Sequence, residues 1–226
     1  MSITRSVLGS ILPVMGLLAA ATAHARQYEV TITNITKGQT FTPQLIATHD
    51  GSVSLFELGA PASAGLELLA EAGDTSGAAG ELTAQGSHVG DVQTIPAPLE
   101  PGHSVSMRLT GRPFQHYFTL AAMLIPTNDT FVSLNRVRLP RWGRRVYTAL
   151  AYDAGSEAND QNCAHIPGPR CGGEGFSPGP NEGDEGYVYV SNGFHDLEDS
   201  EEAEVLGPFV YDWRNPVARI VIKRVK

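Results

Sequence analysis

Three acidic residues stand beside predicted strands, where their carboxylates can gather around a cation. Asp129 ends the turn Pro126-Thr127-Asn128-Asp129 between two apolar runs, and Asp153 and Glu157 lie just after another apolar run. Hard cations such as Ca²⁺ take about six to eight oxygen ligands from carboxylates, carbonyls and water. Ala154 and Gly155 add little side-chain bulk between Asp153 and Glu157, so a turn can bring the carboxylates of both acids toward one ion. From spacing alone two interpretations stay open, a calcium site or three solvated loop acids.

Patterns of common enzymes do not occur in the sequence. It contains no Gly-x-Ser-x-Gly turn, no phosphate-binding glycine loop, no His-Glu-x-x-His pair and no dinucleotide-binding fingerprint. Its seven histidines share no metal-like spacing. We therefore expect no catalytic residues. The alternative is an exported hydrolase, in which these carboxylates act with or without a metal ion.

A cluster of arginines is the second feature that could bind a ligand. Five fall within the ten residues around the turn Leu139-Pro140-Arg141-Trp142-Gly143, namely Arg136, Arg138, Arg141, Arg144 and Arg145. On a strand-turn-strand hairpin several would face one side, where guanidinium groups can bind phosphate or carboxylate. This indicates an anionic glycan or an anionic lipid headgroup as the partner. The alternative is that the arginines only solubilise the hairpin and pair with the acidic segment.

The acidic charge of the chain is unevenly distributed. The net charge is −8 over 226 residues, which has the wrong sign for a nucleic-acid binder. Between Asp153 and Trp213 there are 14 acids against one base, Arg170, so this segment alone carries −13. The acidic excess begins at the turn where the cation is expected.

The N-terminus resembles a secretory signal. Arg5 precedes an apolar stretch from Val7 to Ala21, and Ala23-His24-Ala25 has the small-x-small form of a cleavage site. The stretch is shorter than the roughly 20 residues that span a bilayer. We expect cleavage after Ala25, a secreted or periplasmic location, and no transmembrane segment in the mature chain.

The predicted export bears on the state of the two cysteines. Cys163 and Cys171 are the only cysteines and lie in a Gly/Pro-rich stretch. Because exported proteins meet an oxidising compartment, we expect these thiols to form a disulfide.

Alternating apolar and polar residues predict β-strands around Tyr28–Thr33, Ser104–Leu109 and Ile220–Val225. Further β-rich runs are Phe41–His49, Tyr117–Ile125, Phe131–Val137, Val146–Tyr152 and Tyr187–Val190. One helix is predicted over Ala62–Ala72, after Pro61 and before Gly73. We expect an all-β domain with minor α content, an antiparallel sandwich of about eight strands and one short helix over residues 26–226.

Three stretches of the sequence resemble the spondin-N family, the N-terminal module of F-spondin and related secreted bacterial proteins. They are Leu55–Asp74, Tyr117–Val132 and Leu150–Glu157, the last similar to an aromatic-Asp-Ala-Gly-x-Asp turn. Asn192–His195 and Asp212–Pro216 resemble the bacterial branch. The resemblance implies a C2-like β-sandwich.

The resemblance also implies a function. Members bind Ca²⁺ through acids of these loops, which correspond here to Asp129, Asp153 and Glu157. The sequence departs from the family where Glu157 replaces an Asp and Thr130 replaces a Trp. We therefore expect a non-enzymatic, calcium-dependent binding or adhesion protein of the cell envelope or extracellular space.

Overall fold

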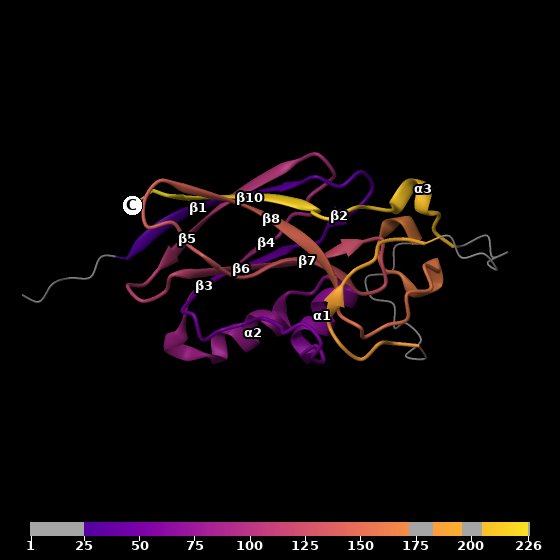
Figure 1. Ribbon diagram of the computed structural model, residues 1–226, viewed down its shortest axis with the longest axis horizontal. Helices are drawn as coiled ribbons and strands as arrows, with labels where there is room; N and C mark the ends of the chain where they lie inside the picture. Colours follow the sequence, from indigo (N-terminus) through magenta and orange to yellow (C-terminus); the bar gives the residue numbers. More distant parts are fainter. Residues whose placement is uncertain (1–24, 172–182, 196–204, 226) are drawn as a thin grey trace, which may run out of the picture.

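The computed structural model describes residues 25–171, 183–195 and 205–225, and these form a mostly antiparallel β structure with two helices, α1 and α2, on one side (Figure 1). The predicted signal sequence and part of the acidic segment lie outside the described residues. The strands are β1 (Arg26–Asn34), β2 (Thr40–Phe41), β3 (Gln44–His49), β4 (Val89–Ile95), β5 (Ser104–Gly111), β6 (Tyr117–Ile125), β7 (Thr130–Arg138), β8 (Arg144–Asp153), β9 (Tyr189–Val190) and β10 (Ala218–Arg224).

The main strands follow the order β4-β3-β6-β7-β8-β10-β1-β5. Strand β8 belongs to both layers of the sandwich, because its first part pairs with β10 and its last residues pair with β7. The two edge strands also approach each other. Asp91 of β4 accepts a hydrogen bond from the backbone of Thr110 at 2.8 Å, and the Thr48 hydroxyl donates to the Thr110 carbonyl at 2.7 Å. The sheet therefore nearly closes on itself, in agreement with the predicted sandwich.

Two apolar cores hold this sheet. Inward-facing residues such as Val30, Phe118 and Ile220 fill the space between the layers. On the outer face of β3, β6 and β7, Leu66 and Leu69 of a helix pack in a second core. Strand β6 is covered on both faces, which explains its almost continuous apolar sequence, interrupted only by Thr119.

The helical layer is larger than the sequence predicts. The helix predicted over Ala62–Ala72 is α1 (Ala64–Ala72), and α2 (Ser76–Ala84) packs beside it. The short α3 (Pro208–Tyr211) lies elsewhere, away from these two helices (Figure 1). Helix α2 has two glycines and only a weak apolar stripe, so its periodicity does not reveal it. Its Glu81 accepts hydrogen bonds from the Ser63 hydroxyl at 2.6 Å and the Gly65 N–H at 2.8 Å, at the start of α1. Tertiary contacts therefore fix α2.

The remaining helical segments are the short 3₁₀ turns Gly86–His88, Cys163–His165 and Pro169–Cys171. Among the described residues, no helix is long and apolar enough to cross a membrane.

Candidate functional site

The turn before β7 and the turn after β8 lie side by side, because these strands are antiparallel neighbours. Thr130 at the start of β7 is in register with Asp153 at the end of β8. The Ala154 N–H donates to the Asp129 carbonyl at 3.2 Å, which extends the ladder by one step. The structure thus brings Asp129 and Asp153 together from separate turns.

Asp129 is fully buried, and its two carboxyl oxygens have different surroundings. Oδ2 accepts hydrogen bonds from the N–H groups of Ser156 at 2.8 Å and Glu157 at 3.1 Å, and the Ser156 hydroxyl lies at 3.3 Å. Oδ1 is buried and receives no hydrogen bond from the described residues. A buried oxygen without a donor is costly, so this atom needs a proton or a cation.

Asp153 is also buried and is held by its own turn. Its Oδ1 accepts from the Gly155 N–H at 2.9 Å, and its Oδ2 accepts from the Asn159 side-chain amide at 3.0 Å. The Asn159 amide also donates to the Tyr189 hydroxyl at 3.0 Å. Burial, followed by the charge of Asp153, raises the pKa of Tyr189.

The two carboxyl groups perturb each other. Burial, followed by the charge of Asp153, raises the pKa of Asp129 well above its usual range, against the opposing effect of the Ser156 and Glu157 N–H groups. Burial also raises the pKa of Asp153. Two adjacent buried acids cannot both ionise cheaply, so a proton or a cation must offset their charge.

Glu157, the third predicted ligand, is buried in the same turn, where its N–H binds Asp129. Within the described ranges, no three His, Cys, Asp or Glu side chains are already arranged as a metal site. The pair Asp129 and Asp153 is therefore the assembled part of the predicted ligand set. A Ca²⁺ ion at this pair would take its remaining oxygen ligands from the Glu157 side chain after a rotation, from backbone carbonyls and from water.

An acidic groove of about 460 Å³ lies beside this turn, and its acids were not among the predicted site residues. Glu67, Glu71 and Asp184 line it together with Ser156. The Glu71 carboxyl is hydrogen-bonded to Ser156, and burial raises the pKa of Glu71. The spacing of Glu67 and Glu71 could have predicted this pair, since acids four residues apart face the same side of a helix.

Neighbouring polar residues brace the segment. The Asn128 amide donates to Asp160 at 3.0 Å, and its carbonyl oxygen accepts from the Gln161 N–H at 3.3 Å. Asp160 is also hydrogen-bonded to His165 Nδ1. The predicted disulfide between Cys163 and Cys171 is present and closes the next turns.

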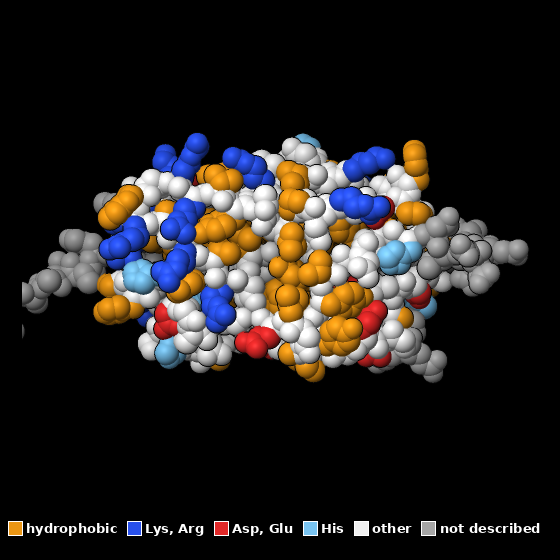
Figure 2. Space-filling model, in the orientation of Figure 1, with side chains coloured by type: hydrophobic (Ala, Val, Ile, Leu, Met, Phe, Trp, Pro, Cys, Tyr) orange, Lys and Arg blue, Asp and Glu red, His pale blue; other side chains and the backbone are white. Residues whose placement is uncertain are grey.

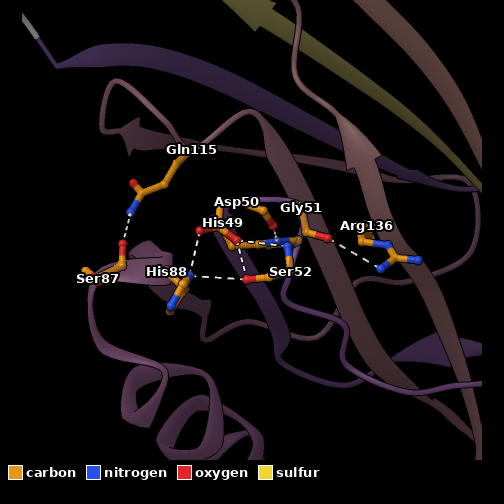
Figure 3. Close-up of polar contacts among 8 residues, drawn as sticks. All are labelled: His49, Asp50, Gly51, Ser52, Ser87, His88, Gln115 and Arg136. Carbon is orange, nitrogen blue, oxygen red and sulfur yellow. Dashed lines mark hydrogen bonds and ion pairs between the residues drawn. The ribbon is translucent and has the colours of Figure 1, made fainter.

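The predicted arginine cluster divides into separate groups at the end of the molecule away from this turn, where basic side chains gather (Figure 2). Arg136 donates to the Gly51 carbonyl at 3.4 Å (Figure 3). Arg144 is opposite Lys223 on β10. The other three predicted arginines line a pocket of about 330 Å³, whose polar lining is Arg26, His116, Arg138, Arg141 and Arg145.

Near this end, Asp50, Ser52 and His88 form a polar cluster whose residue types resemble a catalytic triad (Figure 3). The Ser52 hydroxyl donates to Asp50 at 2.6 Å, and His88 Nδ1 contacts both Asp50 at 2.7 Å and Ser52 at 3.2 Å. In a catalytic triad the Asp and the Ser contact different ring nitrogens of the His, whereas here both contact Nδ1. The hydrogen bonds from Ser52, followed by that from His88, lower the pKa of Asp50 to about 2. The cluster closes the loop after β3 and does not activate a nucleophile.

A comparison with protein families identifies the chain. The model of the Spondin_N family matches residues 15–161, more than half of the sequence, and this region includes Asp129, Asp153 and Glu157. The chain belongs to the spondin-N family. Spondin-N domains are extracellular β-domains of a non-enzymatic type. A search of curated proteins gave no match to this spondin-N protein.

Proposed function

We propose that this spondin-N protein is a secreted or periplasmic calcium-binding module of the bacterial branch, with Asp129, Asp153 and Glu157 as ligands. In this proposal a signal peptide is cleaved after Ala25, and residues 26–226 form one domain. The module binds a partner of the cell envelope or extracellular space and does not catalyse a reaction.

The observation that carries the calcium proposal is the unsatisfied Asp129 Oδ1 beside the Asp153 carboxyl. A divalent cation between these oxygens would neutralise both charges and supply the partner that Oδ1 lacks. The acids Glu67, Glu71 and Asp184 in the adjoining groove would attract the ion to this end. The donor set contains only oxygen atoms, as Ca²⁺ prefers.

The ion would act as a structural clamp. It would join the turn before β7 to the turn after β8, and its binding free energy would add to the stability of the folded state. The ordered turns would then present a defined surface to a partner, whereas the ion-free turns would repel one another.

Burial favours this role over the hydrolase alternative. The exposed fractions of Asp129, Asp153 and Glu157 are 0%, 1% and 1%. A glycosidic bond could not lie between carboxyl groups that no substrate reaches, whereas a small ion needs only oxygen atoms and a short path.

Thermal unfolding with Ca²⁺ or with a chelator tests the proposal. We expect Ca²⁺ to raise the Tm, by the equivalent of about 2.7 kcal/mol when its concentration is about 100 times Kd. Asp153→Ala should abolish the increase, and Asp50→Asn should keep it, because Asp50 follows β3 at the other end of the sheet. No Tm shift with millimolar Ca²⁺ would contradict the proposal.

A further inference from the structure

The arginine-lined pocket lies where the sandwich opens, at the start of β1 and β8. Side chains alternate along each strand, so Arg26 is on the same face as buried Tyr28, and Arg145 is on the same face as buried Ala149. Arg145 is also in register with buried Ile222 of β10. Both arginines therefore stand at the last inward-facing positions, at the mouth of the apolar core.

The other pocket residues come from two neighbouring loops. His116 lies between β5 and β6, and its carbonyl accepts from the Leu139 N–H at 2.8 Å. Arg138 and Arg141 belong to the end of β7 and the turn that follows. Tyr117 and Arg138 are paired across β6 and β7, so the two loops lie side by side. The pocket is thus assembled from four parts of the chain.

The pocket is strongly positive. No Asp or Glu of the described residues lines it, and within those residues none of Arg26, Arg138, Arg141 and Arg145 forms an ion pair. Arg26 donates to His116 Nδ1 at 2.7 Å. A guanidinium can only donate, so the ring is neutral and carries its proton on Nε2. The four arginines and His116 can each donate a hydrogen bond to an anion.

The same two loops carry large exposed aromatic side chains. Phe114, in the loop that contains His116, is 82% exposed, and Trp142, next to Arg141, is 75% exposed. Arginine beside exposed aromatic residues is the composition of surfaces that lie at the boundary of headgroups and acyl chains. A soluble anion would occupy the pocket and leave both aromatic side chains in water.

We propose that this end of the molecule docks on an anionic lipid membrane, with a lipid phosphate in the pocket of Arg26, Arg138, Arg141 and Arg145. Phe114 and Trp142 enter the interface on either side. Guanidinium groups bind phosphate through two parallel hydrogen bonds, and each basic group near an anionic surface contributes roughly a five-fold gain in partition. The acidic turns with Asp129 and Asp153 then face away from the membrane.

Co-sedimentation of the mature protein with vesicles tests this proposal. The vesicles contain phosphatidylcholine alone or with phosphatidylglycerol, and a chelator is present so that calcium plays no part. We expect binding only with phosphatidylglycerol, weakened by salt. Arg138→Gln/Arg145→Gln should lower the partition coefficient roughly 25-fold. The matched pair Arg108→Gln/Arg219→Gln, on β5 and at the far end of β10, should lower it much less.

The aromatic side chains need a separate readout. The only other tryptophan, Trp213, is already buried, so a blue shift of fluorescence on adding vesicles should come from Trp142. Phe114→Ser/Trp142→Ser should remove the shift and weaken binding, whereas Phe209→Ser, an 88% exposed aromatic on α3, should change neither. The proposal is overturned if vesicles do not bind, if the arginine pairs behave alike, or if heparin binds and vesicles do not.

Discussion

Asp129 and Asp153 are buried side by side where β7 begins and β8 ends, and burial, followed by the charge of Asp153, raises the pKa of Asp129. Each is also fixed by N–H groups of the same turn, at Ser156 for Asp129 and at Gly155 for Asp153. In the proposed calcium site, both side chains would be held in place before the ion binds. Such a site would lower the stability of the ion-free protein and raise the affinity for the ion.

Asp129→Asn should stabilise the protein in the presence of a chelator. The variant keeps an oxygen to accept from Ser156 and Glu157, and its NH₂ group can donate to Asp153, which removes the need for a proton or a cation at that position. Removing one of two adjacent buried charges should raise the free energy of unfolding by about 1 to 2 kcal/mol at neutral pH. Urea unfolding measures the gain.

Asp153→Asn is the matched control. Its Oδ2 accepts from the Asn159 amide, so an NH₂ group at that position would face another donor. We expect no gain in stability from this variant, while both variants should lose the response to Ca²⁺. Equal stabilisation by the two would contradict the arrangement of hydrogen bonds described above.

Gly155→Ala should be more damaging than Gly143→Ala. Both glycines have φ of 66°, a conformation that costs other residues about 1 kcal/mol. A Cβ at Gly155 would lie 2.3 Å from the Tyr187 carbonyl oxygen, whereas a Cβ at Gly143 would meet nothing within 4 Å. We expect losses of about 2 to 4 and about 1 kcal/mol. Urea unfolding gives both values, and equal losses would show that the contact with Tyr187 is unimportant.

The disulfide between Cys163 and Cys171 should stabilise the protein through the short loop that it closes. The chain-entropy estimate for a loop of this size is about 2 to 3 kcal/mol. Cys163→Ser/Cys171→Ser should lose this amount in urea unfolding. A reductant should lower the stability of the wild type to the same level and leave the variant unchanged. A reductant effect on the variant would mean that the loss has another origin.

The sequence predicted the parts of the fold that repeat with a fixed period. Strands β1, β5 and β10 alternate clearly because one face is buried and the other is in water. Strand β4 was missed because Gly90 and Asp91 interrupt its alternation, although Asp91 is what binds β5. Helix α2 was missed because it is fixed by the hydrogen bonds of its Glu81 with the start of α1 and has no clear apolar period.

The candidate site divides in the same way. Its two turns followed from strand ends and from the family resemblance, since both depend on nearby residues. The burial of Asp129, the acids Glu67 and Glu71, and the place of Arg26 and His116 beside the arginine turn depend on distant segments meeting. Residues of one loop can be grouped from the sequence because they are close along the chain. A pocket assembled from four segments can be predicted only when the pairing register of the whole sheet is known.

His49 should make the protein less stable in mild acid. Its ring is fully buried, with Nδ1 donating to the Asp50 carbonyl at 2.7 Å and Nε2 accepting from the Thr119 hydroxyl at 2.8 Å. That hydroxyl in turn accepts from the Arg136 N–H at 3.1 Å. The ring is therefore neutral, and burial lowers the pKa of His49 from 6.5.

The pH dependence follows from this shift. Because the unfolded state binds the proton more readily, the contribution of His49 is complete above pH 6.5 and is lost as pH falls toward the lowered pKa. The slope approaches about 1.4 kcal/mol per pH unit. Urea unfolding between about pH 8 and about pH 5 should show this loss in the wild type. His49→Gln should flatten it, and His103→Gln, at an exposed histidine, should keep it. An unchanged slope in His49→Gln would assign the acid sensitivity to another group.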